Sequence, residues 1–258
     1  MQNLAILKSW IVRISQQALS MVFPINCPTC GAVVDSSINP GVFCSDCRIS
    51  FGTDDCVLCP GCAAMLPSDE LLRDGGCYCC QRDDAPLSGI VALGAYHLDP
   101  TLSRMILAMK HGDKTWYSRE FGFQLAEKVR RLYPQKTWDA VVAVPLHRTR
   151  RWKRGYNQAE LVAGFMAKTL RIPAHRWLLS RVRRTLPQSG GRKDRLSNIK
   201  GAFSAGGICK NARIILVDDV VTTGATVGEC AAELFKAGAA EVLVAACAWV
   251  PVIKSTDA

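Results

Sequence analysis

The segment from Ile214 to Thr226 has the residue types that bind a phosphorylated sugar. It reads IILVDDVVTTGAT: an apolar strand, two adjacent carboxylates, and a turn of threonine and glycine that opens a helix. Amides of such a turn can close around a phosphate, and the helix start adds N–H donors. Neighbouring strand residues point to opposite faces, so Asp218 and Asp219 can serve one ligand only where the chain leaves the sheet. Their repulsion favours hydroxyl donors or a divalent cation beside them. An ordinary strand end followed by a helix cap is the alternative, and the combined string argues against it.

Paired cysteines in the first third of the chain predict structural zinc. Ten of the thirteen cysteines lie between Cys27 and Cys80, in a segment with little hydrophobic periodicity. They form two sets of C-x2-C pairs, Cys27, Cys30, Cys44 and Cys47 in one and Cys59, Cys62, Cys77 and Cys80 in the other. A pair points two thiolates at one spot, so each set can hold a tetrahedral Zn2+ whose bonds replace a hydrophobic core. No open coordination position is evident, so we assign these two ions no catalytic role.

The remaining cysteines of this segment leave alternatives in the second zinc set. Cys80 is preferred to Cys79 because it restores the C-x2-C step from Cys77. Cys56 is a spare thiol that could compete for the metal. Redox chemistry is the other use of such pairs, and we favour structural zinc over it.

Positive charge is concentrated in one part of the chain. The 258 residues carry a net charge of +10, and the stretch from Leu146 to Lys200 alone carries +13. Such a face fits a polyanion, either a phosphate-bearing metabolite or nucleic acid, although a solvated surface is the commoner use of a basic run. Trp152, within RRWKR, is the one tryptophan that we consider a candidate for stacking on a base. Core packing is the commoner use of the others, Trp116, Trp138 and Trp177 among them.

From Gly89 onward, strands and helices alternate. Apolar runs predict strands at 89–96, 139–146, 177–182, 212–219 and 241–250, and helical periodicity predicts helices at 101–110, 118–132, 157–170 and 223–237. This alternation predicts a mostly parallel sheet with helices on both faces.

The same patterns divide the chain into three parts. Residues 1–25 predict an amphipathic helix that packs on the body, with a membrane-surface helix as the alternative. Residues 26–86 predict a double zinc ribbon, and residues 87–258 the α/β domain. The composition excludes disorder over most of the chain. We expect no membrane span and no secretory signal, and therefore a cytoplasmic protein without disulfides.

Several motifs together resemble one protein family. VDDVVTTGAT, residues 217–226, resembles the phosphoribosyl pyrophosphate signature of type I phosphoribosyltransferases. Residues 105–114, 143–167 and 188–203 resemble the ComF, or GntX-like, branch of those proteins, and so do the cysteine knuckles in front. The resemblance covers nearly the whole chain. It implies a type I phosphoribosyltransferase fold preceded by a small four-cysteine double zinc-ribbon domain.

The resemblance also implies roles for individual residues. Asp218 and Asp219 would bind the ribose hydroxyls as the catalytic pair, and Thr222, Thr223, Gly224, Ala225 and Thr226 the 5′-phosphate. The pyrophosphate side would be formed by Pro145, Leu146, His147, Arg148, Arg154, Asn157, Gln158 and Lys110, with Mg2+ neutralising the departing group. Arg195 and Asn198 lie in a glycine-rich basic loop that could close over the site. For His147, a hydrogen-bonded loop histidine is an equally good interpretation.

These observations lead to one functional hypothesis and two rivals. We expect a ComF-like protein that binds phosphoribosyl pyrophosphate with Mg2+ and serves natural transformation by handling single-stranded DNA, with the DNA-uptake machinery as a partner. As an enzyme it would be a phosphoribosyltransferase, a pentosyl-transferring enzyme, and the sequence identifies no acceptor. The rivals are a phosphoribosyltransferase of purine or pyrimidine metabolism and a non-catalytic module that senses the metabolite.

Overall fold

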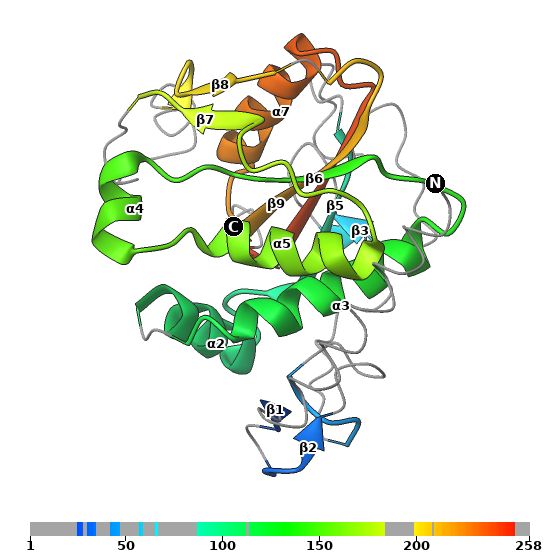
Figure 1. Ribbon diagram of the computed structural model, residues 1–258, viewed down its shortest axis with the longest axis vertical. Coiled ribbons are helices and arrows are strands. Elements are labelled where there is room, and N and C mark those ends of the chain that lie inside the picture. The colour runs from blue at the N-terminus through cyan, green and yellow to red at the C-terminus, as the bar shows by residue number, and fades with distance from the viewer. Residues whose placement is uncertain are drawn as a thin grey trace, which may run out of the picture. The chain divides into compact units, whose positions relative to one another are not determined.

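The protein is shown as a computed structural model in Figure 1. The structure describes residues 25–27, 30–34, 42–46, 57–58, 65–66, 87–111, 114–183, 199–207 and 209–250. The helix expected near the N-terminus lies outside these residues, and so do Arg195, Asn198 and the expected zinc ligands Cys47, Cys59, Cys62, Cys77 and Cys80. The chain divides into two compact units, Met1–Ser50 and Phe51–Ala258.

A six-stranded sheet forms the centre of the second unit. Its strand order is β4 (Met65–Leu66), β3 (Val57–Leu58), β5 (Leu87–Ala95), β10 (Glu241–Trp249), β9 (Arg213–Val221) and β6 (Ala140–Ala143). The last four strands run parallel to one another, whereas β3 is antiparallel to both of its neighbours, β4 and β5. The predicted mostly parallel sheet is therefore confirmed. The hairpin comes from the cysteine-rich segment and pairs with β5 through Leu58 and Ile90.

Helices cover both faces of this sheet (Figure 1). Helix α7 (Ala225–Lys236) packs on one face, together with a hairpin of β7 (Leu179–Arg181) and β8 (Phe203–Ala205). The other face is covered by α2 (Pro100–His111), α3 (Tyr117–Leu132) and α5 (Gln158–Leu170). A short helix, α4 (Arg148–Arg154), lies between β6 and α5 in the chain. The four helices predicted after Gly89 are present with boundaries shifted by a few residues, whereas α4 and β8 were not predicted.

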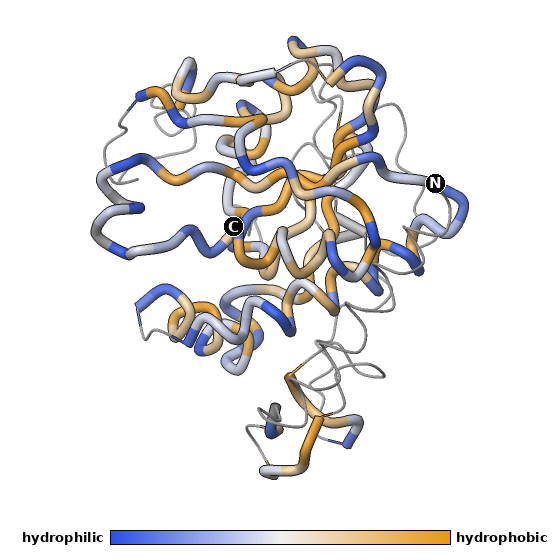
Figure 2. Tube along the Cα trace, in the orientation of Figure 1, coloured by the Kyte–Doolittle hydropathy of each residue, from blue (hydrophilic) through white to orange (hydrophobic). Residues whose placement is uncertain are grey.

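The core consists of aliphatic side chains from the two central strands. Ile214 and Leu216 of β9 belong to the cluster beneath α7, so Ile215 and Val217 face the opposite helices. All four side chains are fully buried. Figure 2 shows the hydrophobic stretches concentrated along the strands. Strands that are buried on both faces need such continuous apolar runs, which is why the sequence pattern identified them.

Close packing of α3 against α5 depends on one glycine. A Cβ added at Gly122 would lie 2.7 Å from the Val162 carbonyl oxygen and 2.7 Å from the Phe165 Cβ. Neither atom can move without shifting α5, because both belong to its backbone or to the base of a side chain. The absence of a side chain at position 122 therefore sets the distance between these two helices.

Candidate functional site

One cavity lies where the parallel strands end, which is the ligand-binding edge of open α/β sheets. Its volume is about 430 Å³. It is lined by Tyr96, His97, Lys110, Val144, Pro145, Leu146, Arg154, Asn157, Gln158, Ala159, Arg181, Asp218, Asp219, Val220, Thr222, Thr226 and Val250. Segments that are far apart in sequence, including the ends of β5, β6, β9 and β10, thus contribute to a single site.

Ten of the residues that the sequence proposed for ligand binding line this cavity. They are Lys110, Pro145, Leu146, Arg154, Asn157, Gln158, Asp218, Asp219, Thr222 and Thr226. Thr223, Gly224 and Ala225 form the turn between two of these residues, whereas His147 and Arg148 do not line the cavity. Tyr96, His97, Arg181 and Val250 line it without having been proposed.

The two carboxylates near the end of β9 form a strongly interacting pair. The Asp219 amide donates a 2.8 Å hydrogen bond to Asp218 Oδ1, and Lys110 Nζ lies 3.0 Å from Asp219 Oδ2. Burial, and then the negative charge of Asp219, raise the pKa of Asp218 to about 8. Lys110 and Arg181 oppose this rise only in part. Asp218 is therefore mostly protonated at neutral pH, and a ligand that favours its charged form must displace a proton.

A short turn connects the end of β9 to helix α7. Gly224 is the N-cap residue of α7 and has φ = +75°, a left-handed conformation that glycine adopts without strain. The Thr223 hydroxyl oxygen accepts a 3.5 Å hydrogen bond from the Ala225 amide. The first turn of the twelve-residue helix α7 thus begins at the cavity, with Thr222 and Thr226 on its wall.

Asn157 fixes the loop on the opposite wall. Its side chain is 2% exposed and caps α5, because Oδ1 accepts a 3.1 Å hydrogen bond from the Ala159 amide. Its Nδ2 donates a 3.0 Å hydrogen bond to the Val144 carbonyl. Asn157 therefore connects the end of β6 to the start of α5 and holds the loop with Pro145 and Leu146 in place.

Gln158 contributes a buried donor that the fold does not satisfy. The residue is 1% exposed, and its Oε1 accepts a 3.5 Å hydrogen bond from Arg154 Nη1. Its Nε2 has no hydrogen-bond partner among the described residues, although Gln158 lines the cavity. An unmade hydrogen bond from a buried amide costs about 1–3 kcal/mol, so a ligand oxygen that accepts it gains affinity.

Lys110 is held at the cavity by a contact between α2 and the loop before α5. The Tyr156 hydroxyl donates a 2.6 Å hydrogen bond to the carbonyl of Met109, the residue before Lys110. This bond joins the last turn of α2 to the chain just before α5. Lys110 is 19% exposed and reaches Asp219 from that position.

The basic run after β6 folds into α4. His147 caps this helix, since its Nδ1 accepts a 3.3 Å hydrogen bond from the Thr149 amide and also lies 2.9 Å from Thr149 Oγ1. Arg151 Nη1 forms a 2.8 Å ion pair with Glu160 Oε1. Trp152 is 93% exposed. The structure thus gives His147 the loop-stabilising role and leaves the Trp152 ring in solvent.

A cluster of three cysteines lies in the first unit. The sulfur atoms of Cys27, Cys30 and Cys44 are all within 4.8 Å of one another, and Cys30 Sγ lies 3.6 Å from Cys44 Sγ. A tetrahedral zinc ion with Zn–S bonds of about 2.3 Å places its sulfur ligands about 3.8 Å apart. The strands β1 (Ile25–Asn26) and β2 (Val33–Val34) form the knuckle, in which the Gly31 amide bonds to the Cys27 carbonyl. The donor set fits zinc.

Within the described part of the chain, no helix is both long and apolar enough to cross a membrane.

Similar proteins were found among solved structures and among curated sequences. A purine phosphoribosyltransferase from Pyrococcus horikoshii is 23% identical, with a TM-score of 0.34 over 52% of this chain and 74% of its own. A glutamine phosphoribosylpyrophosphate amidotransferase from B. subtilis is 22% identical, with a TM-score of 0.34 over 49% of this chain and 25% of its own. No family model matches the chain.

The curated relatives match most of the chain. Competence protein F of Haemophilus influenzae is 34% identical over 218 residues, which are 78% of this chain and 94% of that protein. DNA utilization protein YhgH of Escherichia coli K12 is 31% identical over 205 residues, 78% of this chain and 87% of that protein. The motifs that resemble the ComF branch and this level of identity lead to the same conclusion: the chain belongs to the competence protein F (ComF/GntX-like) family.

Proposed function

We propose that the cavity at the strand ends binds phosphoribosyl pyrophosphate with Mg2+, and that the protein serves DNA uptake by handling single-stranded DNA. The observation that carries the ligand assignment is the meeting of Asp218, Asp219 and the Thr222–Thr226 turn with cations from two helices in one cavity. Carboxylates suit hydroxyl donors, and the turn suits a phosphate. Lys110 and Arg154 suit the charge of pyrophosphate.

The chain's own residues divide the proposed binding between them. Asp218 and Asp219 would accept hydrogen bonds from the ribose hydroxyls, and the amides around Gly224 would bind the 5′-phosphate. Arg154 and the free Nε2 of Gln158 would face the pyrophosphate oxygens. Mg2+ prefers oxygen ligands and keeps several waters, so it would be held mainly by the ligand's phosphates and supply charge neutralisation. A phosphoribosyl transfer would then need an acceptor that attacks the anomeric carbon.

Calorimetric titration with phosphoribosyl pyrophosphate and Mg2+ tests this assignment. The double variant Asp218→Asn, Asp219→Asn keeps the shape of the pair and should abolish measurable binding. Glu127→Gln is a suitable control, because Glu127 belongs to an exposed ion pair with Arg130, outside the cavity lining. Undiminished binding by the double variant would move the ribose site elsewhere.

An assay of turnover distinguishes a catalytic function from a sensing function. Release of pyrophosphate in the presence of a panel of nucleobases would identify a phosphoribosyltransferase and its acceptor. Binding without release, for every base in the panel, would instead support a module that senses the metabolite.

The proposed DNA-handling role rests on the basic segment 146–200 and on the names of the relatives, which refer to competence and to DNA utilization. Affinity for a single strand should fall with salt, with a slope of about −0.7 per phosphate contacted. Replacing Arg150, Arg151 and Lys153 by alanine should flatten that slope. Fluorescence anisotropy at several salt concentrations measures it, and equal slopes would mean that this run is only a solvated surface.

A further inference from the structure

A second hollow lies outside the cavity at the strand ends, at the turn before β7. Its volume is about 340 Å³, and it is lined by Ala174, His175, Arg176, Trp177, Leu178, Gly206 and Gly207. None of these residues lines the cavity that holds Asp218 and Asp219. We call residues 174–178, together with the hollow that they form with Gly206 and Gly207, the Trp177 turn.

The Trp177 turn exposes an aromatic ring that the fold does not use. Trp177 is 81% exposed, whereas Trp138 and Trp249 are 8% and 3% exposed. Our expectation of core packing holds for Trp138 and is wrong for Trp177. An exposed indole offers a flat apolar face on a side chain with little conformational entropy to lose, which suits stacking on another ring.

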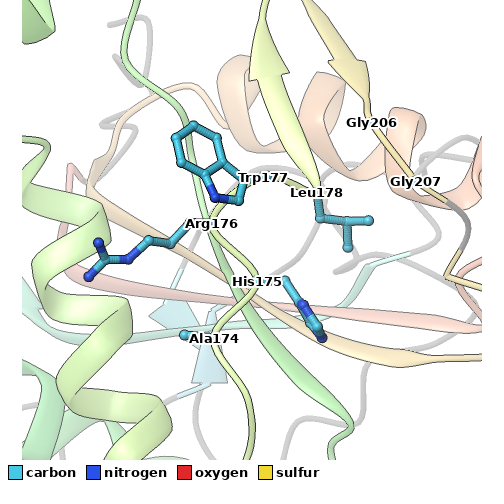
Figure 3. Close-up of a pocket in the computed structure, with 7 residues that line it drawn as sticks. All are labelled: Ala174, His175, Arg176, Trp177, Leu178, Gly206 and Gly207. Carbon is cyan, nitrogen blue, oxygen red and sulfur yellow. The ribbon is translucent and has the colours of Figure 1, made fainter.

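The ring lies beside a cation on the same side of the turn. In Figure 3 the indole of Trp177 and the guanidinium of Arg176 extend to one side of the chain, while His175 and Leu178 extend to the other. The side chains of His175 and Arg176 make no hydrogen bond or ion pair with the described residues. A stacking surface, an available cation and a hollow therefore occur together.

The backbone holds the Trp177 turn firmly against the sheet. The His175 amide donates a 2.9 Å hydrogen bond to the Val141 carbonyl on edge strand β6, and the Val141 amide donates one of 2.9 Å to Pro173. On the other side, the Gly206 amide bonds to Leu178 at 2.8 Å. A Cβ at Gly206 would lie only 2.9 Å from the Trp177 carbonyl oxygen, so the glycine permits this contact.

The segments that form the Trp177 turn and the adjoining hairpin are rich in arginine, and the Glu229 carboxylate of α7 contacts them at the Gly201 amide. The described residues 171–183 and 199–207 include Arg171, Arg176, Arg181, Arg183 and Lys200, and none of them is an aspartate or glutamate. A surface with an excess of cations attracts a polyanion, and an exposed aromatic ring within it adds sequence-tolerant stacking on bases. Both properties are needed to bind unpaired nucleotides, whereas duplex DNA hides its base faces.

We propose that the Trp177 turn is a contact site for single-stranded nucleic acid, with a base stacked on the Trp177 indole and a neighbouring phosphate at Arg176. The hollow lined by His175, Leu178 and the two glycines accommodates the next nucleotide. This inference rests on the proposed handling of single-stranded DNA and names where on the surface the strand binds. The site is separate from the phosphoribosyl pyrophosphate cavity, so the two ligands do not compete for it.

The test uses the full chain and a fluorescein-labelled oligothymidylate, with anisotropy as the readout. Trp177→Ala should lower the affinity about tenfold or more, and Trp177→Phe should restore most of it, because phenylalanine keeps a stacking face. Arg176→Ala should reduce the magnitude of the salt slope by about 0.7, while Arg104→Ala, which removes an exposed cation from α2, should leave the slope unchanged. Binding of phosphoribosyl pyrophosphate with Mg2+ should be the same in Trp177→Ala and wild type.

Four outcomes would overturn the proposal. If Trp177→Ala binds the oligothymidylate as tightly as wild type, no base stacks on Trp177. If Trp177→Phe binds as weakly as Trp177→Ala, the effect does not come from stacking on an aromatic ring. If phosphoribosyl pyrophosphate competes with the oligothymidylate, the DNA binds in the cavity with Asp218 and Asp219 instead. A wild-type chain that binds no oligothymidylate would refute the proposed DNA handling itself, and that result is read before any variant is made.

Discussion

The raised pKa of Asp218 leads to a prediction about the pH dependence of ligand binding. Burial and the charge of Asp219 raise the pKa from an ordinary value of 3.8 to about 8, so only about one tenth of the molecules carry the Asp218 charge at pH 7. Hydroxyl donors and Mg2+ both favour the charged carboxylate. Binding of phosphoribosyl pyrophosphate with Mg2+ should therefore release about one proton, and the affinity should rise about tenfold between about pH 7 and about pH 9.

Calorimetric titrations across this range measure the effect. Phosphate groups with a pKa of about 6 are already ionised there, so the ligand adds little slope of its own. Repeating the titration at pH 7 in buffers of different ionisation enthalpy counts the released protons directly. Asp218→Asn should bind more weakly and with a nearly flat pH profile. A wild-type profile that is flat above pH 7, or an unchanged slope in Asp218→Asn, would refute the reasoning.

The same pKa makes a separate prediction for the ligand-free protein. A carboxyl group whose pKa is raised on folding contributes stability below its unfolded pKa of about 4 and loses it as the pH rises through about 8. Asp218→Asn, which cannot ionise, should thus equal wild type in thermal stability at about pH 4 and exceed it at about pH 8. A wild-type advantage at the higher pH would contradict the assigned direction.

Three further predictions concern the parts of the protein that support the site. Elemental analysis should find two zinc ions per chain, and Cys27→Ser should reduce the content, because it removes a thiolate from the described cluster; a folded, metal-free wild type would exclude both sites. Gly122→Ala should destabilise the protein by about 1–3 kcal/mol, a melting temperature lower by several degrees, because its Cβ would meet α5 at 2.7 Å; Gly164→Ala, which meets nothing within 4 Å, is the control. Tyr156→Phe removes the hydrogen bond to Met109 and should cost about 0.5–1.5 kcal/mol of stability. It should also weaken ligand binding, because Lys110 follows Met109; full affinity measured by calorimetry would show that Tyr156 does not position Lys110.

The sequence predicted the parallel strands well because each is an unbroken apolar run. It did not predict α4, whose seven residues are mostly arginines and have no apolar face to give a helical period. The cap of His147 and the left-handed Gly155 that ends the helix were the available signals. Strand β8, only three residues long, depends on pairing with β7 and leaves almost no pattern in the sequence.

The candidate site was predictable where residues form a contiguous motif. Asp218, Asp219 and the following turn are such a motif, and their place at the strand ends follows from the fold class. Arg181 was missed because it reaches the cavity through the β7–β8 hairpin, which is separate from the central sheet, and Tyr96 because it follows β5 outside any motif. The exposure of Trp177 likewise depends on a turn anchored to β6, and a tryptophan between arginine and leucine gives no sign of it.

The β3–β4 hairpin has a consequence for how the chain can be shortened. Because Leu58 pairs with Ile90, the hairpin covers an edge of β5 that would otherwise present unpaired amides and carbonyls along a nine-residue apolar strand. Exposed edges of this kind template association between chains. A fragment that begins at residue 87, the boundary suggested by the cysteine pattern, would uncover that edge and aggregate, whereas one that begins at residue 51 would retain its protection.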